Sequence, residues 1–194
     1  MDVLEDREII HRCQCGQTQL LDILIDRYKD VLYSLCMKLA KNRPDADDLF
    51  QDTWVNVMKN IGSFSLERKF STWLLAICIN RYRDRYRWQK RWIHRLKHFA
   101  SARHIEDETA GQEVNNPLPD ELLIRDEKTQ AVRKALDMLG DIYRMPVILH
   151  YFYDLPIEEV GSILEIPPGT VKSRLSKGRQ LLKRSMEDAG HGRS

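Results

Sequence analysis

Two carboxylates and a carboxamide, Asp48, Gln51 and Asp52, are spaced so that a helix would bring them onto one exposed face. Such a face suits docking onto an arginine-rich protein surface, because a carboxylate binds a guanidinium group through two parallel hydrogen bonds. A metal or acid–base site is the alternative, but no His or Cys lies nearby in the sequence, and aspartates in a first helical turn often serve as caps. The apolar side of the same helix would consist of Phe50, Trp54, Val57 and Ile61.

A basic and aromatic segment, NRYRDRYRWQKRWIHRLK, extends from Asn80 to Lys97. Arginines neutralise phosphates and aromatic rings stack on unpaired bases, so this mixture favours contact with both duplex and single-stranded nucleic acid. A solvated helix face without a partner is the other interpretation of such a charge run. On a helix, one face would carry Arg83, Tyr86, Arg87 and Lys90, and the other would carry Arg81, Arg85, Trp88 and Trp92.

The segment LPIEEVGSILEIPPGTVKSRLSKGRQLLK predicts two helices joined by a tight Pro-Pro-Gly turn. This layout is typical of a helix-turn-helix, whose second helix enters the major groove while its apolar side packs on the first. A helical hairpin with a solvated basic face is the alternative. The apolar sides would comprise Ile157, Val160, Ile163 and Leu164, then Val171, Leu175 and Leu182. The open side would present Thr170, Lys172, Ser173, Ser176, Lys177 and Gln180, which suit base edges and phosphates.

The segment from His11 to Cys15 places His and Cys side chains close together, so zinc binding and redox sensing are both possible interpretations. Alternate positions on a helix point in different directions, and Cys36 and Cys78 are remote in the sequence, so ordinary helix residues and reduced thiols are expected. The sequence shows no phosphate-binding glycine loop, no cluster of metal ligands and no nucleophile with a base. We therefore expect no metal, no cofactor and no enzymatic activity.

The elements that position these side chains are expected to be helices. Of the 194 residues, 42% are hydrophobic and 31% are charged, with a net charge of only +2, which favours an all-α protein. The first helix would bury Leu21, Leu24, Ile25, Tyr28, Leu32, Leu35 and Leu39. The second would begin near Pro44 and run to about Ile61, and the third would be capped by Ser71 and continue into the basic segment. A strand in RYRDRYRW is rejected, because no turn signal separates it from that third helix.

Periodicity disappears between about Ala100 and Asp120, where EDETAGQEVNNPLPDE is polar, acidic and broken by Gly and Pro. This composition predicts a flexible linker between two small helical domains. After it, Val132, Leu136 and Leu139 mark a helix, and three shorter helical segments follow, separated by Gly140, Pro146, Pro156 and the turn from Ile166 to Gly169. The start, MDVLEDREII, lacks the features of a signal peptide, and no stretch is long enough to span a membrane, so a cytoplasmic protein without stable membrane insertion is expected.

Three of these segments resemble motifs of the extracytoplasmic-function (group 4) RNA polymerase sigma factors of the sigma-70 family. DADDLFQDTW, residues 45–54, is similar to the D-A-E-D-L-V-Q-E-T-F signature of their region two. FSTWLLAI, residues 70–77, followed by Asn80 and the arginines, looks like their promoter-melting and minus-ten helix. GTVKSR, residues 169–174, looks like their minus-thirty-five recognition helix. The departures are Asp for Glu at Asp47 and Asp52 and Trp for Phe at Trp54.

This resemblance implies an alternative sigma factor that binds RNA polymerase core and directs initiation at promoters with minus-thirty-five and minus-ten elements. Residues 1–98 would form sigma region 2 for core binding, minus-ten recognition and melting, 99–120 a flexible acidic linker, 121–188 sigma region 4 with the helix-turn-helix, and 189–194 a disordered tail. The implied core-binding residues are Asp45, Asp48, Gln51 and Asp52. The implied minus-ten contacts are Ser63, Phe64, Lys69, Phe70, Thr72, Trp73, Asn80, Arg83 and Arg87, within the loop from Gly62 to Lys69 and the helix after it. The implied minus-thirty-five contacts are Thr170, Lys172, Ser173, Arg174, Ser176 and Lys177.

The implied partners are the clamp coiled coil of the beta-prime subunit and the beta flap of core polymerase, promoter DNA, and a cognate anti-sigma factor. The implied location is the cytoplasm, at the nucleoid or held at the membrane by the anti-sigma factor. A stand-alone helix-turn-helix regulator is the main alternative and an enzyme is the second. The acidic face and the aromatic-basic helix, which a simple repressor does not need, favour the sigma factor.

Overall fold

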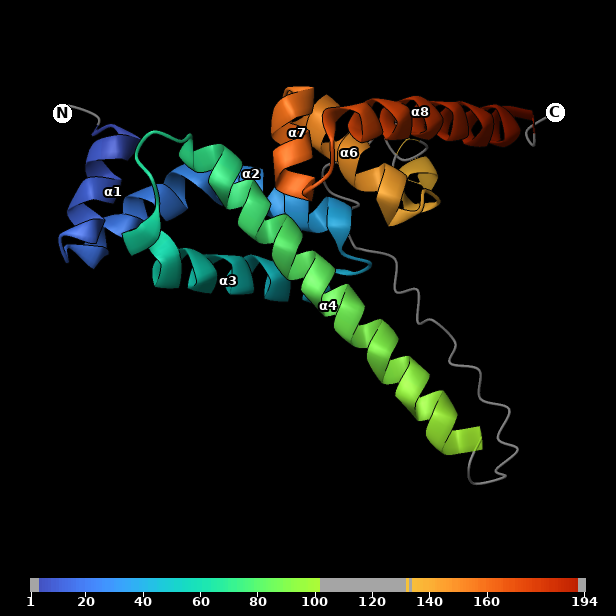
Figure 1. Ribbon diagram of the computed structural model, residues 1–194, viewed down its shortest axis with the longest axis horizontal. Coiled ribbons are helices and arrows are strands. Elements are labelled where there is room, and N and C mark those ends of the chain that lie inside the picture. Colours follow the sequence, from blue (N-terminus) through green and yellow to red (C-terminus); the bar gives the residue numbers. More distant parts are fainter. Residues whose placement is uncertain (1–3, 102–131, 133, 192–194) are drawn as a thin grey trace. The chain divides into compact units, whose positions relative to one another are not determined.

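The computed structural model describes residues 4–101, 132 and 134–191, which form two compact helical units (Figure 1). The first unit contains α1 (Asp6–Gln14), α2 (Leu21–Leu39), α3 (Arg43–Asn60) and α4 (Phe70–Ser101), with 3-10 turns at Thr18–Leu20 and Ile61–Ser63. The second contains α6 (Asp141–Phe152), α7 (Ile157–Leu164) and α8 (Pro168–His191). Every regular element in the described ranges is a helix, so the predicted all-α fold with two helical domains is confirmed.

The core of the first unit forms where α2 packs against α1, α3 and α4. Leu24, Leu32 and Leu35 of α2 are fully buried, as their three-four spacing predicts. Ile25 and Tyr28, which were expected on the same buried stripe, are only half-buried. Burial of one leucine side chain stabilises a fold by about 1.5–3 kcal/mol. The leucine stripe of α2 therefore holds the other three helices together.

The break between α2 and α3 is built by Asn42 and Pro44. The Asn42 side-chain oxygen accepts a hydrogen bond from the backbone N–H of Asp45 at 2.9 Å, which caps α3. Pro44 lies in the first turn, where the missing N–H of proline would have no helical partner, and this position agrees with the prediction. The helix ends at Asn60, and a short 3-10 turn carries the chain into the loop that precedes α4.

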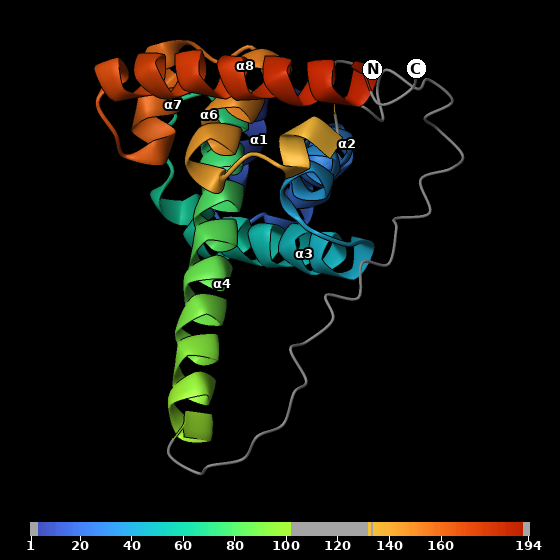
Figure 2. The ribbon, with the colours of Figure 1, turned by 90° about the vertical axis from the view of Figure 1, so that its right-hand side faces the viewer.

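The basic and aromatic segment lies in α4, so its helical interpretation is confirmed over the strand alternative. The prediction that Ser71 caps this helix is wrong, because α4 begins at Phe70 and Ser71 lies in its first turn. The Lys69 carbonyl accepts the hydrogen bond from the N–H of Trp73 at 3.2 Å and so occupies the capping position. The second half of α4 extends beyond α3 in both ribbon views (Figures 1 and 2).

The boundaries of the helices differ from the boundaries predicted for the domains. Helix α4 runs to Ser101, past residue 98, and α8 runs to His191, past residue 188, into the range predicted to be a disordered tail. Most of the predicted linker, 99–120, lies outside the described residues, as do the residues from 121 to 131.

In the second unit, α6, α7 and α8 all contact one another (Figure 2). Residues 134–137 form a helical segment before α6, in the range where Leu136 and Leu139 predicted a helix, and both leucines are buried. The prediction that Pro146 separates two helices is wrong, because it lies inside α6. A proline in a helix removes one backbone hydrogen bond, and burial of its neighbours Met145, Val147 and Ile148 offsets that loss. The third segment was expected to be short, whereas α8 is 24 residues long.

Helices α6 and α8 lie in close contact at Gly178. A Cβ atom at this position would lie 2.8 Å from Val147 Cγ2 and 3.6 Å from the Tyr143 carbonyl oxygen. Only a glycine permits this helix crossing without displacing a neighbour. Gly178 was not predicted to have a role, because a glycine within a helical pattern gives no sign of a partner helix.

Candidate functional site

The acidic face of α3 is solvent-exposed in the structure. Asp48, Gln51 and Asp52 are exposed, and Asp45 is partly exposed one turn earlier. Trp54 and Val57 point into the core, with 5% and 0% of their surfaces exposed. Phe50 is half-buried and its ring packs edge-on against Tyr33 at 5.7 Å. We define the acidic patch as Asp45, Asp48, Gln51 and Asp52, the four residues that the sequence analysis singled out.

An arginine of α4 partly neutralises this patch. Arg85 Nη2 lies 3.2 Å from Asp48 Oδ2 and 3.6 Å from Asp45 Oδ1. Asp48 remains 64% exposed and Asp45 remains 42% exposed in these contacts. Arg85 was expected only as one residue of the basic helix, and its pairing with the carboxylates was not predicted. The two charged segments therefore meet within one unit.

Asp47 has a different role from its acidic neighbours. It accepts a hydrogen bond from the Tyr33 hydroxyl at 2.7 Å, which ties α3 to α2. Burial and the Asp47 carboxylate raise the pKa of Tyr33, so that this hydroxyl stays protonated and able to donate. Asp47 is therefore a structural residue of the α2–α3 pair.

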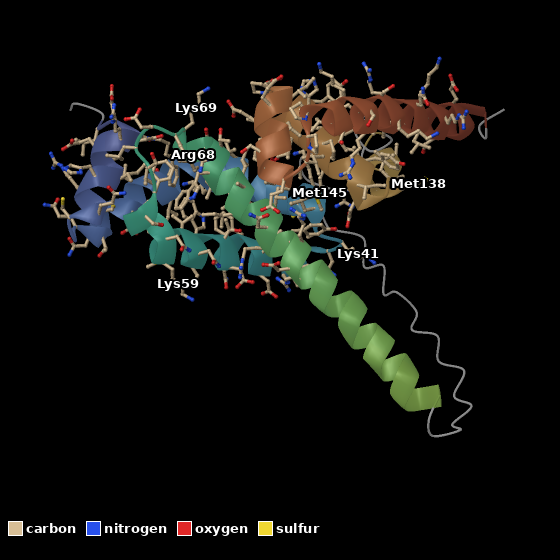
Figure 3. The ribbon with its side chains drawn as sticks, viewed as in Figure 1. Lys41, Lys59, Arg68, Lys69, Met138 and Met145 are labelled. Carbon is tan, nitrogen blue, oxygen red and sulfur yellow. The ribbon has the colours of Figure 1, made fainter. Side chains whose placement is uncertain are left out.

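The exposed side of α3 continues past the acidic patch as an apolar surface. Val55 is 44% exposed and Met58 is 58% exposed, and both follow Asp48 and Asp52 at helical spacing along α3. Lys59 lies at the same end of the helix (Figure 3). Neither apolar residue was predicted to be exposed, although the spacing of three residues from Asp52 to Val55 and from Val55 to Met58 was a signal that could have found them. An apolar area beside charged groups is the usual composition of a protein interface.

The loop between α3 and α4 is held by an aromatic cluster. Phe64 and Phe70 are buried, with 6% and 3% of their surfaces exposed, and both rings contact Trp73, at 4.7 Å and 5.8 Å. Tyr28 of α2 packs edge-on against Phe70 at 5.2 Å. The structure thus places two of the expected minus-ten residues, Phe64 and Phe70, in the interior, where they position the loop.

Gln14 of α1 fixes the other side of this loop. Its side-chain amide donates hydrogen bonds to the carbonyl oxygens of Ile61 and Phe64, both at 2.9 Å. The next turn is closed by the Arg68 N–H, which donates to the Ser65 carbonyl at 3.0 Å. This role of Gln14 was not predicted, because its partners are backbone atoms that are remote in the chain.

The surface of the loop is polar and basic. Ser63, Arg68 and Lys69 are exposed, and the two basic side chains lie next to the start of α4 (Figure 3). A hollow of about 510 Å³ opens beside them, between the loop, α1 and α2. Arg7 and Arg27 also line it. The expected DNA-binding loop therefore presents cations around a concave surface.

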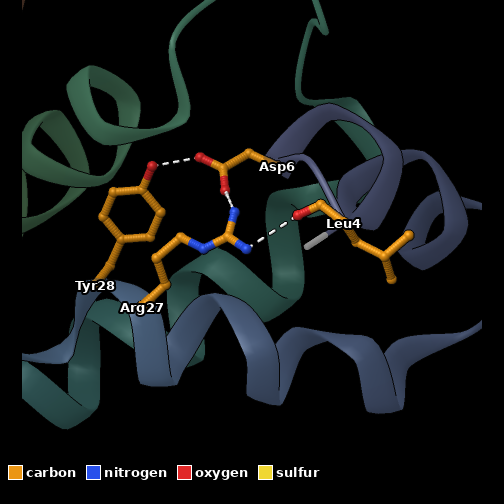
Figure 4. Close-up of polar contacts among 4 residues, drawn as sticks. All are labelled: Leu4, Asp6, Arg27 and Tyr28. Atoms are coloured by element: carbon orange, nitrogen blue, oxygen red, sulfur yellow. Dashed lines mark hydrogen bonds and ion pairs between the residues drawn. The ribbon is translucent and has the colours of Figure 1, made fainter. Parts of the chain in front are cut away.

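One wall of this hollow is fixed by contacts between α1 and α2 (Figure 4). Asp6 accepts hydrogen bonds from the Tyr28 hydroxyl and the Arg27 guanidinium, and Arg27 also donates to the Leu4 carbonyl at 3.0 Å. Burial and the Asp6 contact raise the pKa of Tyr28 to about 12, so that its hydroxyl remains a donor at neutral pH. These contacts hold the start of α1 beside the loop.

The first half of α4 carries the remaining minus-ten residues that were expected. Asn80 is exposed, and Thr72, Trp73 and Arg83 are half-buried. The side chain of Arg87 lies outside the described residues. The buried side of the helix is formed by Leu74, Leu75, Cys78 and Ile79. Ile77, expected in the core, is only half-buried, because packing against α2 and α3 covers a sector of the helix centred on Leu75 and Cys78.

The turn between α7 and α8 has the geometry of a tight helix-turn-helix joint. Glu165 adopts a left-handed conformation with φ 57°, and the Ile166 N–H donates to the Gly161 carbonyl at 3.0 Å. A Cβ at Gly161 would lie 2.8 Å from the Ile166 carbonyl oxygen, so a glycine permits this return. The Pro167 carbonyl accepts hydrogen bonds from the N–H groups of Thr170 and Val171 and starts α8.

Helix α8 presents its polar residues as the sequence predicts. Val160 and Ile163 of α7 and Val171 and Leu175 of α8 are buried in the core that these helices form with α6. The exposed residues on the open side of α8 are Lys172, Ser173, Ser176, Lys177 and Gln180. Thr170 and Arg174 are half-buried, and the Ser173 hydroxyl donates to the Thr170 carbonyl at 2.9 Å. The structure thus brings the six expected minus-thirty-five residues onto the first turns of one helix.

Three of the four cysteines, Cys13, Cys36 and Cys78, are buried, as structural thiols usually are. Cys13 is buried against the core of the first unit, and burial raises its pKa, whereas Cys15 is exposed. Cys36 of α2 and Cys78 of α4 are buried with their sulfurs 3.7 Å apart. No group of three His, Cys, Asp or Glu side chains within the described residues is arranged to hold a metal ion.

Two family models match the chain: Sigma-70 region 2 over residues 24–92 and Sigma-70, region 4 over residues 129–182. The chain is 33% identical over 188 residues to the ECF RNA polymerase sigma factor SigW of Bacillus subtilis, with 92% of this chain and 95% of the relative covered. It is 26% identical over 185 residues to the ECF RNA polymerase sigma-E factor of Escherichia coli K12, with 95% of each covered.

Two solved structures have a similar fold. CnrH in complex with the cytosolic domain of CnrY matches with a TM-score of 0.64 at 20% identity, over 94% of this chain and 97% of that one. The sigma factor RpoE in complex with the anti-sigma factor NepR from Bartonella quintana matches with a TM-score of 0.62 at 24% identity, over 86% of this chain and 96% of that one. Within the described part of the chain, none of the helices is long and apolar enough to cross a membrane.

Proposed function

The chain belongs to the sigma-70 family, among its extracytoplasmic-function sigma factors, and we propose which of its surfaces bind core polymerase and which bind the promoter. Sigma factors of this group direct promoter-specific transcription with RNA polymerase. The acidic patch of α3 docks on core polymerase, the loop before α4 and the exposed side of α4 engage the minus-ten element, and α8 reads the minus-thirty-five element. The protein has no catalytic step of its own and acts in the cytoplasm, where its polymerase and DNA partners are.

The observation that carries this proposal is the exposure of the acidic patch above a buried apolar base. Asp48 and Asp52 face solvent, while Trp54 and Val57 of the same helix are buried. An arginine-rich partner can therefore reach the carboxylates without any change in the fold. Val55 and Met58 extend the docking surface with the apolar contact area that an interface needs at its centre. The partner in this proposal is the clamp coiled coil of the beta-prime subunit.

The loop from 62 to 69 suits contact with a melted strand because it is both anchored and exposed. Gln14 and the aromatic cluster hold its backbone, and Ser63 and Lys69 project into solvent. Asn80 lies exposed on α4, and its amide can donate to and accept from a base edge. Phe64 and Phe70 act by positioning these groups. Thr72, Trp73, Arg83 and Arg87 complete the proposed minus-ten set on α4.

The exposed polar side of α8 suits a major groove. Lys172, Ser173 and Lys177 lie near the N-terminal end of a helix that is held firmly against α7. The first turns of a recognition helix reach deepest into the groove. In this proposal the second unit also binds a protein partner, which is the beta flap of core polymerase.

A cognate anti-sigma factor is a further proposed partner. The structural neighbours CnrH and RpoE were solved with CnrY and with the anti-sigma factor NepR, respectively. An inhibitor of this kind would hold the protein away from core polymerase, and a membrane-bound inhibitor would place it at the membrane.

The test is run-off transcription with core polymerase and this chain as the sole sigma factor, followed by co-purification of charge-reversed variants. Asp48→Lys combined with Asp52→Lys should abolish binding to core while the helical content stays at the wild-type value and the protein still unfolds cooperatively. Lys59→Glu, on the same helix outside the patch, is the matched control and should still bind. Retention of the Asp48→Lys/Asp52→Lys variant on core at the wild-type level, at equal salt, would exclude the patch as the docking site.

A further inference from the structure

Arg85 is the cation that the acidic patch already holds. Its Nη2 atom contacts both Asp48 and Asp45, at 3.2 Å and 3.6 Å, from a different helix. The Arg85 side chain is 38% exposed, so the group lies at the surface where a partner would approach. Any arginine-rich partner that binds the patch must displace this contact or share it.

The contact has the geometry of a weak ion pair. A single nitrogen makes both contacts, whereas a guanidinium group binds a carboxylate most strongly through two parallel hydrogen bonds. The other terminal nitrogen, Nη1, is buried and makes no hydrogen bond within the described part of the chain. A buried donor without an acceptor lowers the net gain from the contact. Arg85 therefore occupies the patch, but the hydrogen-bonding capacity of its guanidinium group and of the two carboxylates is only partly used.

We propose that Arg85 is an internal competitor for the acidic patch, which lowers the affinity of the free protein for core polymerase. This inference rests on the proposed docking of core on the acidic patch. An incoming arginine that binds Asp48 through two hydrogen bonds replaces the single Arg85 contact, so each binding event carries the cost of breaking it. The chain thereby limits non-specific attraction of its carboxylates to other basic surfaces.

The experiment compares the affinity of core polymerase for the full chain and its variants in the absence of DNA. Arg85→Ala should bind core about two- to fivefold more tightly, the range expected when one exposed ion pair no longer opposes binding. Its affinity should also fall more steeply with salt, because the patch carries more net negative charge. Arg85→Lys, which keeps the charge and a single contact, should stay near the wild-type affinity.

Arg81→Ala is the matched control. Arg81 lies one turn earlier on α4, is 40% exposed and pairs with Asp84 at 3.1 Å, outside the acidic patch. This variant should bind core with the wild-type affinity. An equal gain in Arg81→Ala would show that any loss of positive charge on α4 suffices, and would overturn the specific role of Arg85.

The Arg85→Ala substitution is also made in a variant whose carboxylates are neutralised, so that failure of the competitor role can be distinguished from failure of the docking proposal. Asp45→Asn combined with Asp48→Asn should weaken core binding, and adding Arg85→Ala to it should give no further gain, because the competed carboxylates are gone. If the double Asn variant binds core normally, the docking proposal fails. If it weakens binding but Arg85→Ala in the wild-type background binds equally or less tightly than wild type, only the competitor role is overturned.

Discussion

The side-chain amide of Gln14 lies 2.9 Å from the carbonyl oxygen of Phe64, and this contact joins α1 to the loop that precedes α4. The same amide also reaches the Ile61 carbonyl, so one side chain holds two backbone groups of the turn. The loop carries exposed groups proposed to meet the melted strand, while its own backbone is fixed from behind.

Gln14→Ala should loosen this loop without unfolding the protein. Loss of hydrogen bonds to two carbonyls costs about 1 kcal/mol each in stability, which leaves the fold intact. Transcription from a duplex promoter should fall severalfold, while binding to core polymerase stays unchanged. Gln19→Ala, at an exposed position of the neighbouring 3-10 turn, is the control and should behave as wild type. Equal transcription by the two variants would show that the loop does not depend on Gln14.

Asn80→Ala combined with Lys69→Ala should affect promoter melting more than later steps. Both side chains are exposed, so their removal leaves the core unchanged. If they hold unstacked bases, transcription from a duplex promoter should be strongly reduced and transcription from a pre-melted promoter reduced much less. The measurement is run-off transcription on the two templates with the same holoenzyme. Losses of the same size on both templates would place the role of these residues outside melting.

Substitutions in α8 should separate base readers from phosphate contacts. Ser173→Ala and Lys172→Ala should cost about 1 to 3 kcal/mol on the preferred promoter and relax specificity at one base pair each. Lys177→Ala should weaken binding to all promoter sequences alike and lower the slope of log affinity against log salt concentration by about one unit. Open-complex formation on a panel of minus-thirty-five substitutions at several salt concentrations provides the measurement. An unchanged promoter ranking in every variant would mean that α8 does not read sequence.

Gly178→Ala should destabilise the second unit by about 1–3 kcal/mol, since its Cβ would lie 2.8 Å from Val147 Cγ2 and force α6 and α8 apart. Gly169→Ala is the matched control in the same helix, because no atom lies within 4 Å of a Cβ there. The control should be neutral or slightly stabilising, as alanine favours a helix over glycine. Thermal unfolding of the two variants measures the difference, and an equal melting temperature would show that the α6–α8 crossing adapts to the methyl group.

The local patterns of the sequence determined which residues share a helix face. Helical spacing places Asp48, Gln51 and Asp52 together regardless of what α3 packs against, and the same holds for Lys172 and Ser173 on α8. The order of the three motifs identified the family, and the fold class followed from the same periodicity. These features depend on residues only a few positions apart, so the chain alone specifies them.

Contacts between helices were decided only by the tertiary structure. Arg85 meets Asp48 across 37 positions in the chain, and Gln14 meets Phe64 across 50. Phe64 and Phe70, expected to touch DNA, are buried because α2 supplies Tyr28 to the same aromatic cluster. Helical periodicity fixes the direction of a side chain relative to its own helix and not the neighbour that it meets. That neighbour depends on how the helices pack to bury their apolar faces, which is a property of the whole unit.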